Sequence, residues 1–209
     1  MRRAFLIPAV VAPLLAACGT VSVGVGVGGG SGGIGGGVSA STDVGSDSAR
    51  TAGGQLKVTM FKIDAKGIQE EIGILMLMDS RGGLRIEPAL GSLPPGTHGF
   101  HLHEGSNCGP GMKDGKMQAG IAAGEHYDPR TTGKHDGPMG NGHRGDLPVL
   151  NVDEAGNATQ MMHALQLSVN DVRGRAFVIH AGGDNFSDLP KPLGGGGGRI
   201  ACGVVPAGD

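Results

Sequence analysis

The chain has 209 residues, enough for one ordinary domain with appendages. Its 43 glycines are too many for a compact domain of this size, so a glycine-rich segment outside the folded unit is expected. There is no tryptophan, one tyrosine and a formal net charge of −2, which argues against base stacking and against a phosphate-binding surface. The composition therefore predicts no nucleic-acid partner.

The first residues are typical of an exported chain. Met1-Arg2-Arg3 precedes an apolar run from Ala4 to Ala17, which has the length of a signal-peptide core and is too short to span a bilayer. Small residues then lead into Cys18, a pattern that resembles the lipobox of bacterial lipoproteins, whose cysteine carries the lipid. A plain signal peptide that contains a cysteine is the alternative. We predict a signal peptide over 1–18 with lipidation at Cys18.

Residues 19–54 are mostly Gly, Ser, Val and Ala. Such a segment cannot bury enough apolar surface to offset the entropy of ordering, so it should be a disordered tether. The folded domain is then expected over 55–209. This organisation would hold the domain near a membrane and leave it free to move.

Two cysteines remain besides the one in the lipobox, Cys108 and Cys202. An oxidising compartment favours a disulfide between them over two free buried thiols. The bond would close a loop of about 95 residues, for which chain entropy allows up to about 4–5 kcal/mol of stabilisation.

Short apolar or alternating runs recur between turn signals and predict eight strands. These runs are Leu56 to Ile63, Ile72 to Met78, Leu84 to Leu90, His98 to His103, Leu147 to Val152, Ala158 to Met162, Ala176 to His180 and Arg199 to Val205. Gln166 to Arg175 is the one ambiguous segment and is interpreted as a connection. The pattern predicts an all-β sandwich or barrel. The polar stretch 104–146 is too long for an ordinary loop and is therefore expected to be functional.

All eight histidines lie between His98 and His180. In His101-Leu-His103 the strand period of two places both imidazoles on one face, where they can chelate one ion. His180 ends another apolar strand. A single His-x-His pair is weak evidence, and a structural role is as good an interpretation of it alone.

The long loop adds His126, His135, His143 and Asp146 among glycines and prolines. No regular structure would orient these side chains, but a bound metal would. Three histidines and a carboxylate suit tetrahedral zinc, and imidazole-rich sites suit copper or zinc. The spacing therefore predicts copper, zinc or both, and does not name a reaction.

Six motifs follow one another in a fixed order across residues 55–206. They are Gly99-Phe-His-Leu-His103, Ala123-Gly-Glu-His126-Tyr-Asp-Pro129, Gly133-Lys-His135, Gly142-His143-Arg-Gly-Asp146-Leu-Pro148, Val178-Ile-His180-Ala-Gly-Gly-Asp184-Asn and Gly198-Arg199-Ile-Ala-Cys202-Gly-Val. Together they resemble the bacterial copper–zinc superoxide dismutases. The resemblance implies an eight-stranded Greek-key β-barrel with long metal-binding loops, which agrees with the strand pattern.

The resemblance also implies two ligand sets that share His126 as a bridging imidazolate. The copper ligands would be His101, His103, His126 and His180, and the zinc ligands His126, His135, His143 and Asp146. Asp184 would link His101 to His135 behind the metals, as ligating imidazoles need an orienting partner. Arg199 would lie beside copper and attract the anion, and Cys108–Cys202 would be the family disulfide.

The implied activity is the dismutation of superoxide to dioxygen and hydrogen peroxide. Copper would cycle between Cu(II) and Cu(I), while His126 takes up and returns a proton and zinc holds the loop. The protein would be an oxidoreductase of the periplasm, tethered by its lipid. Gly19 rather than aspartate follows the lipidated cysteine, which favours the outer membrane over the inner. Both monomers and homodimers occur in this family, and the sequence leaves that choice open.

A copper or zinc buffering protein on the same fold is the alternative function, and a surface lipoprotein stabilised by metals is a further one. Arg199 disfavours buffering, because storage of metal needs no residue that guides an anion. Glu125 departs from the glycine that bacterial members usually have, and is either solvated or weakens anion attraction. His98 is expected to be a core histidine, and His163 an ordinary strand-end residue.

Overall fold

The computed structural model describes residues 54–208. The predicted signal peptide, Cys18 and nearly all of the predicted tether lie outside the described residues. Within the described part of the chain, no helix has the length and hydrophobicity that crossing a membrane requires.

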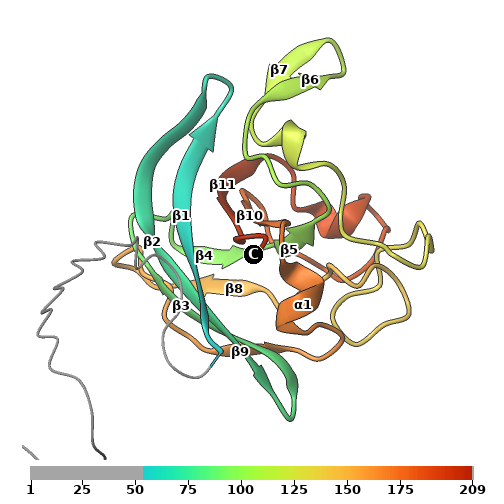
Figure 1. Cartoon of the computed structure of the whole chain (residues 1–209). Coiled ribbons are helices and arrows are strands. Elements are labelled where there is room, and N and C mark those ends of the chain that lie inside the picture. The colour runs from blue at the N-terminus through green and yellow to red at the C-terminus, as the bar shows by residue number, and fades with distance from the viewer. Residues whose placement is uncertain (1–53, 209) are drawn as a thin grey trace, which may run out of the picture. The chain divides into compact units, whose positions relative to one another are not determined.

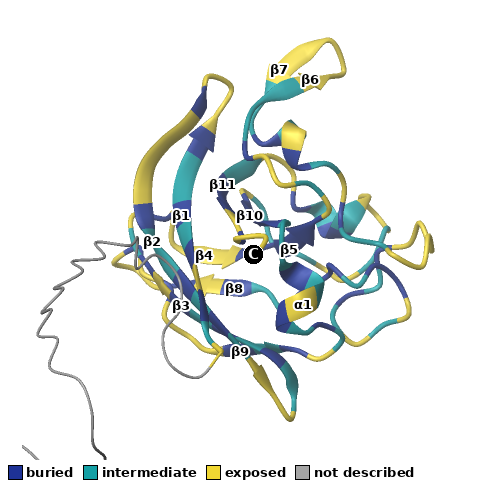
Figure 2. Ribbon diagram, in the orientation of Figure 1, coloured by how far each residue is buried: buried dark blue, intermediate teal, exposed yellow. Residues whose placement is uncertain are grey.

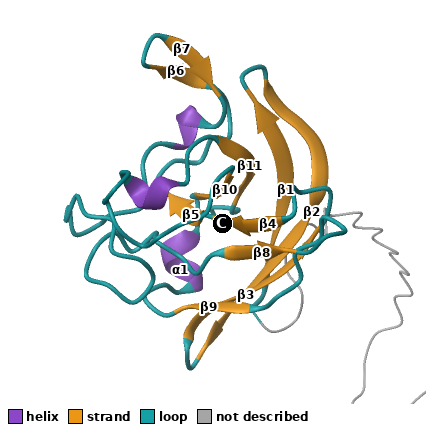
Figure 3. Cartoon of the chain, turned by 180° about the vertical axis from the view of Figure 1, so that it is seen from behind, coloured by secondary structure: helices purple, strands orange, loops and turns teal. Residues whose placement is uncertain are grey.

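Strands dominate this part of the chain, with three short helical segments (Figure 3). The strands are β1 (Leu56–Asp64), β2 (Gly67–Ser80), β3 (Gly83–Leu90), β4 (Gly96–His98), β5 (Phe100–His103), β6 (Gly111–Lys113), β7 (Lys116–Gln118), β8 (Leu150–Val152), β9 (Met162–Ala164), β10 (Ala176–His180) and β11 (Arg199–Val204). The helical segments are η1 (Ile121–Ala123), α1 (Val169–Val172) and η2 (Leu193–Gly195).

Seven of the strands form one antiparallel sheet in the order β5-β10-β11-β1-β2-β3-β9, and Figure 1 shows it strongly curled. The chain leaves β3 near one edge of this sheet, passes through β4, and enters β5 at the opposite edge. Such a long return between distant strands is the Greek-key connection. The separate pair β4–β8 continues from β5, since only Gly99 separates β4 from β5. The predicted all-β barrel architecture is confirmed.

Alternating side chains build the core inside this curl. In β3, Leu84, Ile86, Pro88 and Leu90 are buried while the residues between them are more exposed, as the strand period of two requires. Phe100 of β5 stacks on Phe177 of β10 with ring centroids 5.4 Å apart. β5 and β10 are buried along their whole length, so the side chains that they carry toward the long loops are rigidly held (Figure 2).

The described residues contain eleven strands where the sequence predicted eight, because the run His98 to His103 divides into β4 and β5 and the hairpin β6–β7 is added. Other details differ as well. The strand predicted at 158–162 is β9, at Met162–Ala164, because Ala158 forms only an isolated bridge with Leu90. Gln166 to Arg175 is not merely a connection, since it contains α1. Asp171 Oδ2 accepts a hydrogen bond from the Ser168 backbone N–H at 2.8 Å, and the Ser168 side chain accepts one from Asp171 N–H, which is a capping box. The long loop also contains the unpredicted hairpin β6–β7, which turns at Asp114-Gly115 with positive φ at both residues.

The predicted disulfide between Cys108 and Cys202 is confirmed. It joins the long loop after β5 to strand β11, across a sequence separation of 94 residues. A small buried cluster surrounds it, formed by Ile63, Ala123, Ala176 and Val178. The start of the long loop is therefore fixed to the barrel wall.

The double substitution Cys108→Ser/Cys202→Ser should lower the free energy of unfolding by about 2–5 kcal/mol, because a cross-link over so long a loop restricts the unfolded chain. Urea denaturation of the full chain in the presence of a chelator measures the change. In the same experiment, a reductant should destabilise the original chain and leave the serine variant unaffected. Equal stability of the two chains would contradict this role of the disulfide.

Candidate metal centre

The free edge of β5 brings the long loop to the two histidines of the His-x-His pair. His101 and His103 both lie on β5, and isolated bridges join His101 to Asp146 and His103 to His126. Gly145 permits the close approach, because a Cβ atom at this position would overlap the carbonyl oxygen of Leu102. The backbone thus brings the two histidines of β5 together with two side chains of the long loop, His126 and Asp146.

His180 arrives from the neighbouring strand. It is the last residue of β10, where a register shift after Ile179 pairs it with Arg199 of β11. Such irregularities re-aim a side chain at the end of a strand. The His180 ring lies 4.7 Å from that of His101, centroid to centroid. Two sheet strands and one loop therefore supply four imidazoles to one cluster.

In this first cluster, one nitrogen of each ring is held by the protein and the other is free. His101 Nε2 lies 2.7 Å from Asp184 Oδ2, His103 Nδ1 lies 2.9 Å from the Gly124 carbonyl and His180 Nδ1 lies 3.2 Å from the Gly197 carbonyl. Because these acceptors need a proton from the ring, the opposite nitrogen keeps its lone pair. The buried nitrogens without a hydrogen-bond partner are His101 Nδ1, His103 Nε2, His126 Nε2 and His180 Nε2.

Burial keeps these rings in the neutral form that binds metals. Burial, and then repulsion from His101, lowers the pKa of His126 to about 3. Burial, followed by repulsion from neighbouring histidines and from Arg199, also lowers the pKa values of His103 and His180. Four neutral imidazoles, each with an unpaired lone pair, are costly to bury unless something binds them.

The second cluster is centred on one oxygen of Asp146. Nδ1 of His126 and Nδ1 of His135 each lie 2.9 Å from Asp146 Oδ1, and Nδ1 of His143 lies 3.2 Å from it. For His135 Nδ1 the contact lacks hydrogen-bond geometry, and this nitrogen is buried without a partner. Three imidazoles and a carboxylate that converge in this way form a tetrahedral donor set.

Asp184 connects the two clusters from behind. Its Oδ2 faces His101 Nε2, while its Oδ1 lies 2.8 Å from His135 Nε2. Burial opposes protonation of His135, but its close contacts with the carboxylates of Asp146 and Asp184 outweigh it and raise the pKa of His135 to about 9. Gly194 is required here, because a Cβ atom would overlap both the Asp184 carboxylate and the His135 ring.

Both donor sets fit the predicted metals. The potential ligand atoms within each set lie within 4.8 Å of one another, and all of the residues are buried. The four-imidazole set, with its orphaned lone pairs, suits copper, and the set with three imidazoles and a carboxylate suits zinc. The structure brings together every residue that the sequence placed in each set. The ring of His126 belongs to both, with Nε2 in the first and Nδ1 in the second.

A cavity of about 370 Å³ opens on the first cluster. We call it the arginine cavity; its lining includes Lys113, Ile121, His126, His180, Leu193 and Arg199. The Arg199 guanidinium is fixed by hydrogen bonds of 2.6 Å to the Gly120 carbonyl and 2.8 Å to the Gly124 carbonyl. A positive group is therefore held rigidly in the same cavity as two of the histidines.

A second cavity, of about 480 Å³, lies on the side of the zinc-type set. We call it the carboxylate cavity; its lining includes Glu104, Glu125, His126, Asp128, His143 and Leu193. Glu125 is exposed, and its Oε1 lies 3.7 Å from Lys113 Nζ. Glu125, which stands where the resemblance led us to expect glycine, thus lines this cavity and not the arginine cavity.

The two remaining histidines lie outside both clusters. His98 is buried, and its two ring nitrogens each lie 2.8 Å from a backbone carbonyl, those of His180 and Pro94, as expected for a core histidine. His163 lies within β9, with Nδ1 3.3 Å from Ser80 Oγ.

The sequence did not reveal the groups that orient the ligands through the backbone. The carbonyls of Gly124 and Gly197 orient His103 and His180, and the backbone N–H of His135 donates to Asp188 Oδ2 at 2.9 Å. A backbone carbonyl has no residue signature, so only the glycine-rich composition of these segments indicated that the backbone approaches the ligands closely.

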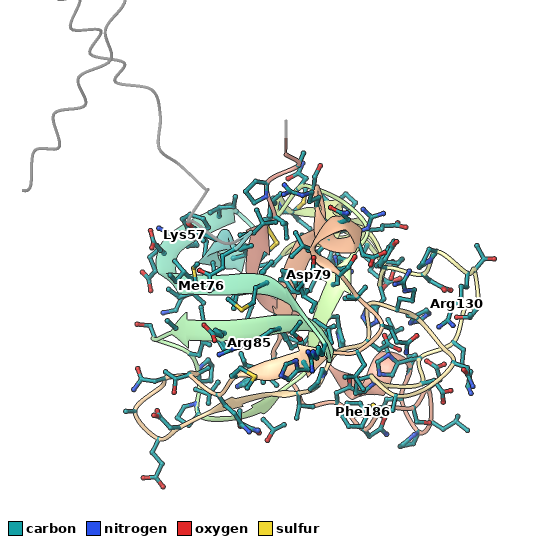
Figure 4. All side chains as sticks on the ribbon, turned by 60° about the horizontal axis from the view of Figure 1, so that its bottom comes forward. Lys57, Met76, Asp79, Arg85, Arg130 and Phe186 are labelled. Carbon is teal, nitrogen blue, oxygen red and sulfur yellow. A yellow bond between two sulfur atoms is a disulfide. The ribbon has the colours of Figure 1, made fainter. Side chains whose placement is uncertain are left out.

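In Figure 4, Arg130 and Phe186, which belong to the two loops around the centre, lie on the side of the domain away from Lys57.

Comparison with known proteins identifies the family. The sequence model of the family described as copper/zinc superoxide dismutase (SODC) matches residues 72–205. Superoxide dismutase [Cu-Zn] 2 of Salmonella typhimurium is 52% identical over 150 residues, which cover 71% of this chain and 87% of that protein. Superoxide dismutase [Cu-Zn] of Escherichia coli is 49% identical over 150 residues, with the same shares of 71% and 87% covered.

Solved structures agree. The Cu/Zn superoxide dismutase from Brucella abortus matches with a TM-score of 0.71 and 43% identity, over 72% of this chain and 99% of that one. The solution structure of the monomeric copper, zinc superoxide dismutase from Salmonella enterica gives a TM-score of 0.66 and 51% identity, over 72% and 99%. The chain belongs to the copper/zinc superoxide dismutase family. It is thus an oxidoreductase with copper and zinc as cofactors, and the predicted Greek-key β-barrel is confirmed.

Proposed function

We propose that the two clusters are the dinuclear centre at which this chain converts superoxide to dioxygen and hydrogen peroxide. One observation carries the proposal: the His126 ring presents Nε2 to three further imidazoles and Nδ1 to the zinc-type set. The assignment is copper at His101, His103, His126 and His180, and zinc at His126, His135, His143 and Asp146. When bound, copper supplies one-electron redox chemistry, and zinc, which has none, fixes geometry.

The chain's own part in the reaction is to orient ligands and to hold a proton. His126 Nε2 is buried without a hydrogen-bond partner and is the atom that can take up a proton whenever it is not a ligand; the residue itself is part of the lining of the arginine cavity. Its Nδ1 is directed at the zinc set, which would hold the ring in position whether Nε2 is a ligand or carries a proton. Asp184 keeps His101 and His135 in the matching tautomers.

Arg199 attracts the anion. The two backbone carbonyls that accept its hydrogen bonds fix the guanidinium, and no carboxylate of the described residues lines the same cavity. A small anion that reacts near the diffusion limit gains from such a local charge more than from net charge. A metal-buffering protein would not need this group, so the buffering alternative is disfavoured.

We further propose that the chain is periplasmic and tethered, with a signal peptide over 1–18, lipid on Cys18, a Gly/Ser-rich tether over 19–54 and the enzyme domain over 55–209. The support is the sequence pattern at the N-terminus, together with the bacterial origin of the relatives. A homodimer stays a prediction; the related structure from Salmonella enterica is described as monomeric.

Replacement of one copper ligand tests the activity. His180→Ala in the metal-loaded full chain should lower the rate of copper-dependent superoxide removal by about 100-fold or more. Even the loss of a residue that only orients a metal ligand lowers metal affinity or activity by about 10–100-fold. Zinc content should stay at one per chain, because His180 belongs to the first cluster alone. His163→Ala, in β9, is the matched control and should keep full activity. Turnover by the His180 variant at the original rate would refute the proposed copper site.

The role of Arg199 has an ionic-strength signature. Arg199→Gln should lower kcat/KM about tenfold at low salt with unchanged copper content, and the remaining rate should depend less on salt, because the attracting charge is gone. Arg199→Lys should fall in between, because an ammonium keeps the charge but lacks the planar fork that contacts both carbonyls. Equal rates for the glutamine variant and the original chain across the salt range would contradict anion attraction by this residue.

A further inference from the structure

The two cavities that meet at the metal centre carry opposite charges. His126 and Leu193 line both. Among the described residues, the charged groups that line the arginine cavity are Lys113 and Arg199, with no carboxylate. Those that line the carboxylate cavity are Glu104, Glu125 and Asp128, with no lysine or arginine. The substrate is an anion and is served by the first cavity, so the activity gives no reason for the second.

The carboxylates of the second cavity keep oxygen atoms available. Asp128 Oδ2 accepts hydrogen bonds from Thr132 Oγ1 at 3.0 Å and from the Gly133 N–H at 2.8 Å, while Oδ1 is buried and has no partner. Glu104 and Glu125 lie together, since Glu104 Oε1 is 3.5 Å from the Glu125 backbone nitrogen. Carboxylate oxygens with spare lone pairs are ligands for hard divalent cations.

A buried imidazole of the second cluster forms part of the wall of the same cavity. His143 is 8% exposed and lines the carboxylate cavity. Its Nδ1 lies 3.2 Å from Asp146 Oδ1, so this ring connects the cavity to the second cluster. The cavity therefore begins at exposed carboxylates and ends at a residue of the proposed zinc set.

We infer that the carboxylate cavity is the entrance through which a divalent cation, Zn²⁺ in the working protein, reaches His143 and the other zinc ligands. Glu104, Glu125 and Asp128 attract the ion and hold it transiently before it moves inward. This inference rests on the zinc assignment made above. It gives Glu125 a role: this carboxylate serves cation uptake and is not part of the lining of the cavity that guides the anion.

Electrostatics favours separate entrances. A cavity with walls of one charge sign raises the local concentration of the opposite ion and its association rate by about 10–10³-fold. Three carboxylates in the arginine cavity would repel superoxide, and Arg199 in the carboxylate cavity would repel Zn²⁺. Lys113 lies at the boundary, 3.7 Å from Glu125, and weakens the field of that carboxylate in part.

The test is the rate at which the metal-stripped full chain takes up Co²⁺, a spectroscopically visible substitute for Zn²⁺. Stopped-flow absorption follows the band of tetrahedral Co²⁺, and activity is not involved. Glu104→Gln/Glu125→Gln should bind Co²⁺ about tenfold more slowly at low salt and reach the same final spectrum and stoichiometry. The control Glu71→Gln/Glu154→Gln removes two exposed carboxylates that line neither cavity and should keep the original rate. Glu125→Asp, which keeps the charge, should bind faster than Glu125→Gln.

The outcomes separate this inference from the assignment beneath it. Equal uptake rates for the original chain and the Glu104/Glu125 variant, with a normal tetrahedral spectrum, would overturn the entrance and leave the zinc site intact. An equal slowing in the control variant would also overturn it, because net charge and not the cavity would then set the rate. Absence of tetrahedral Co²⁺ in the original chain would overturn the zinc assignment, and the entrance with it.

Discussion

The imidazole ring of His126 faces two donor sets, and the geometry of the whole centre depends on that double contact. Nε2 has three imidazoles around it and Nδ1 lies 2.9 Å from Asp146 Oδ1, so neither set is complete without this side chain. A ring has only two nitrogens, and their directions are fixed by its plane. The strand that carries His101 and His103 and the loop that carries Asp146 must therefore meet at one side chain. The isolated bridges from β5 to His126 and to Asp146 provide this meeting through the backbone.

Long loops can hold this geometry because the barrel fixes them at several points. The disulfide ties the start of the long loop to β11, and Arg199 binds two carbonyls of the same segment. Asp184 joins ligands from β5 and from the loop, while Asp188 holds the His135 backbone. These fixed points also divide the approach to the centre into a positive and a negative cavity. In our proposals, anion guidance and cation uptake thus use two different cavities that share His126 in their lining.

The sequence predicted the strands best where the alternation of apolar and polar residues was long, as in β1 and β3, or where a short apolar run is fully buried, as in β10. It failed at short elements whose signals lie inside loops: the capping box at Ser168 starts a four-residue helix, and Asp114-Gly115 turns the β6–β7 hairpin. All seven side chains of the two clusters could be named from the sequence, since His-x-His on a strand and a histidine-rich glycine loop are visible in one dimension. The division of the approach into two cavities could not be foreseen. It depends on Glu104, Glu125 and Asp128 coming together through tertiary contacts that have no local signature.

The most direct test is anomalous X-ray diffraction from crystals of the copper- and zinc-loaded chain, with data collected on either side of the copper and zinc absorption edges. The account predicts two separate peaks, copper beside Nδ1 of His101 and Nε2 of His103 and His180, and zinc beside Nδ1 of His135 and His143 and the Asp146 carboxylate, with the His126 ring between the peaks. A single metal position, or a His126 ring in contact with neither metal, would contradict the shared-ring centre from which the proposed chemistry is derived.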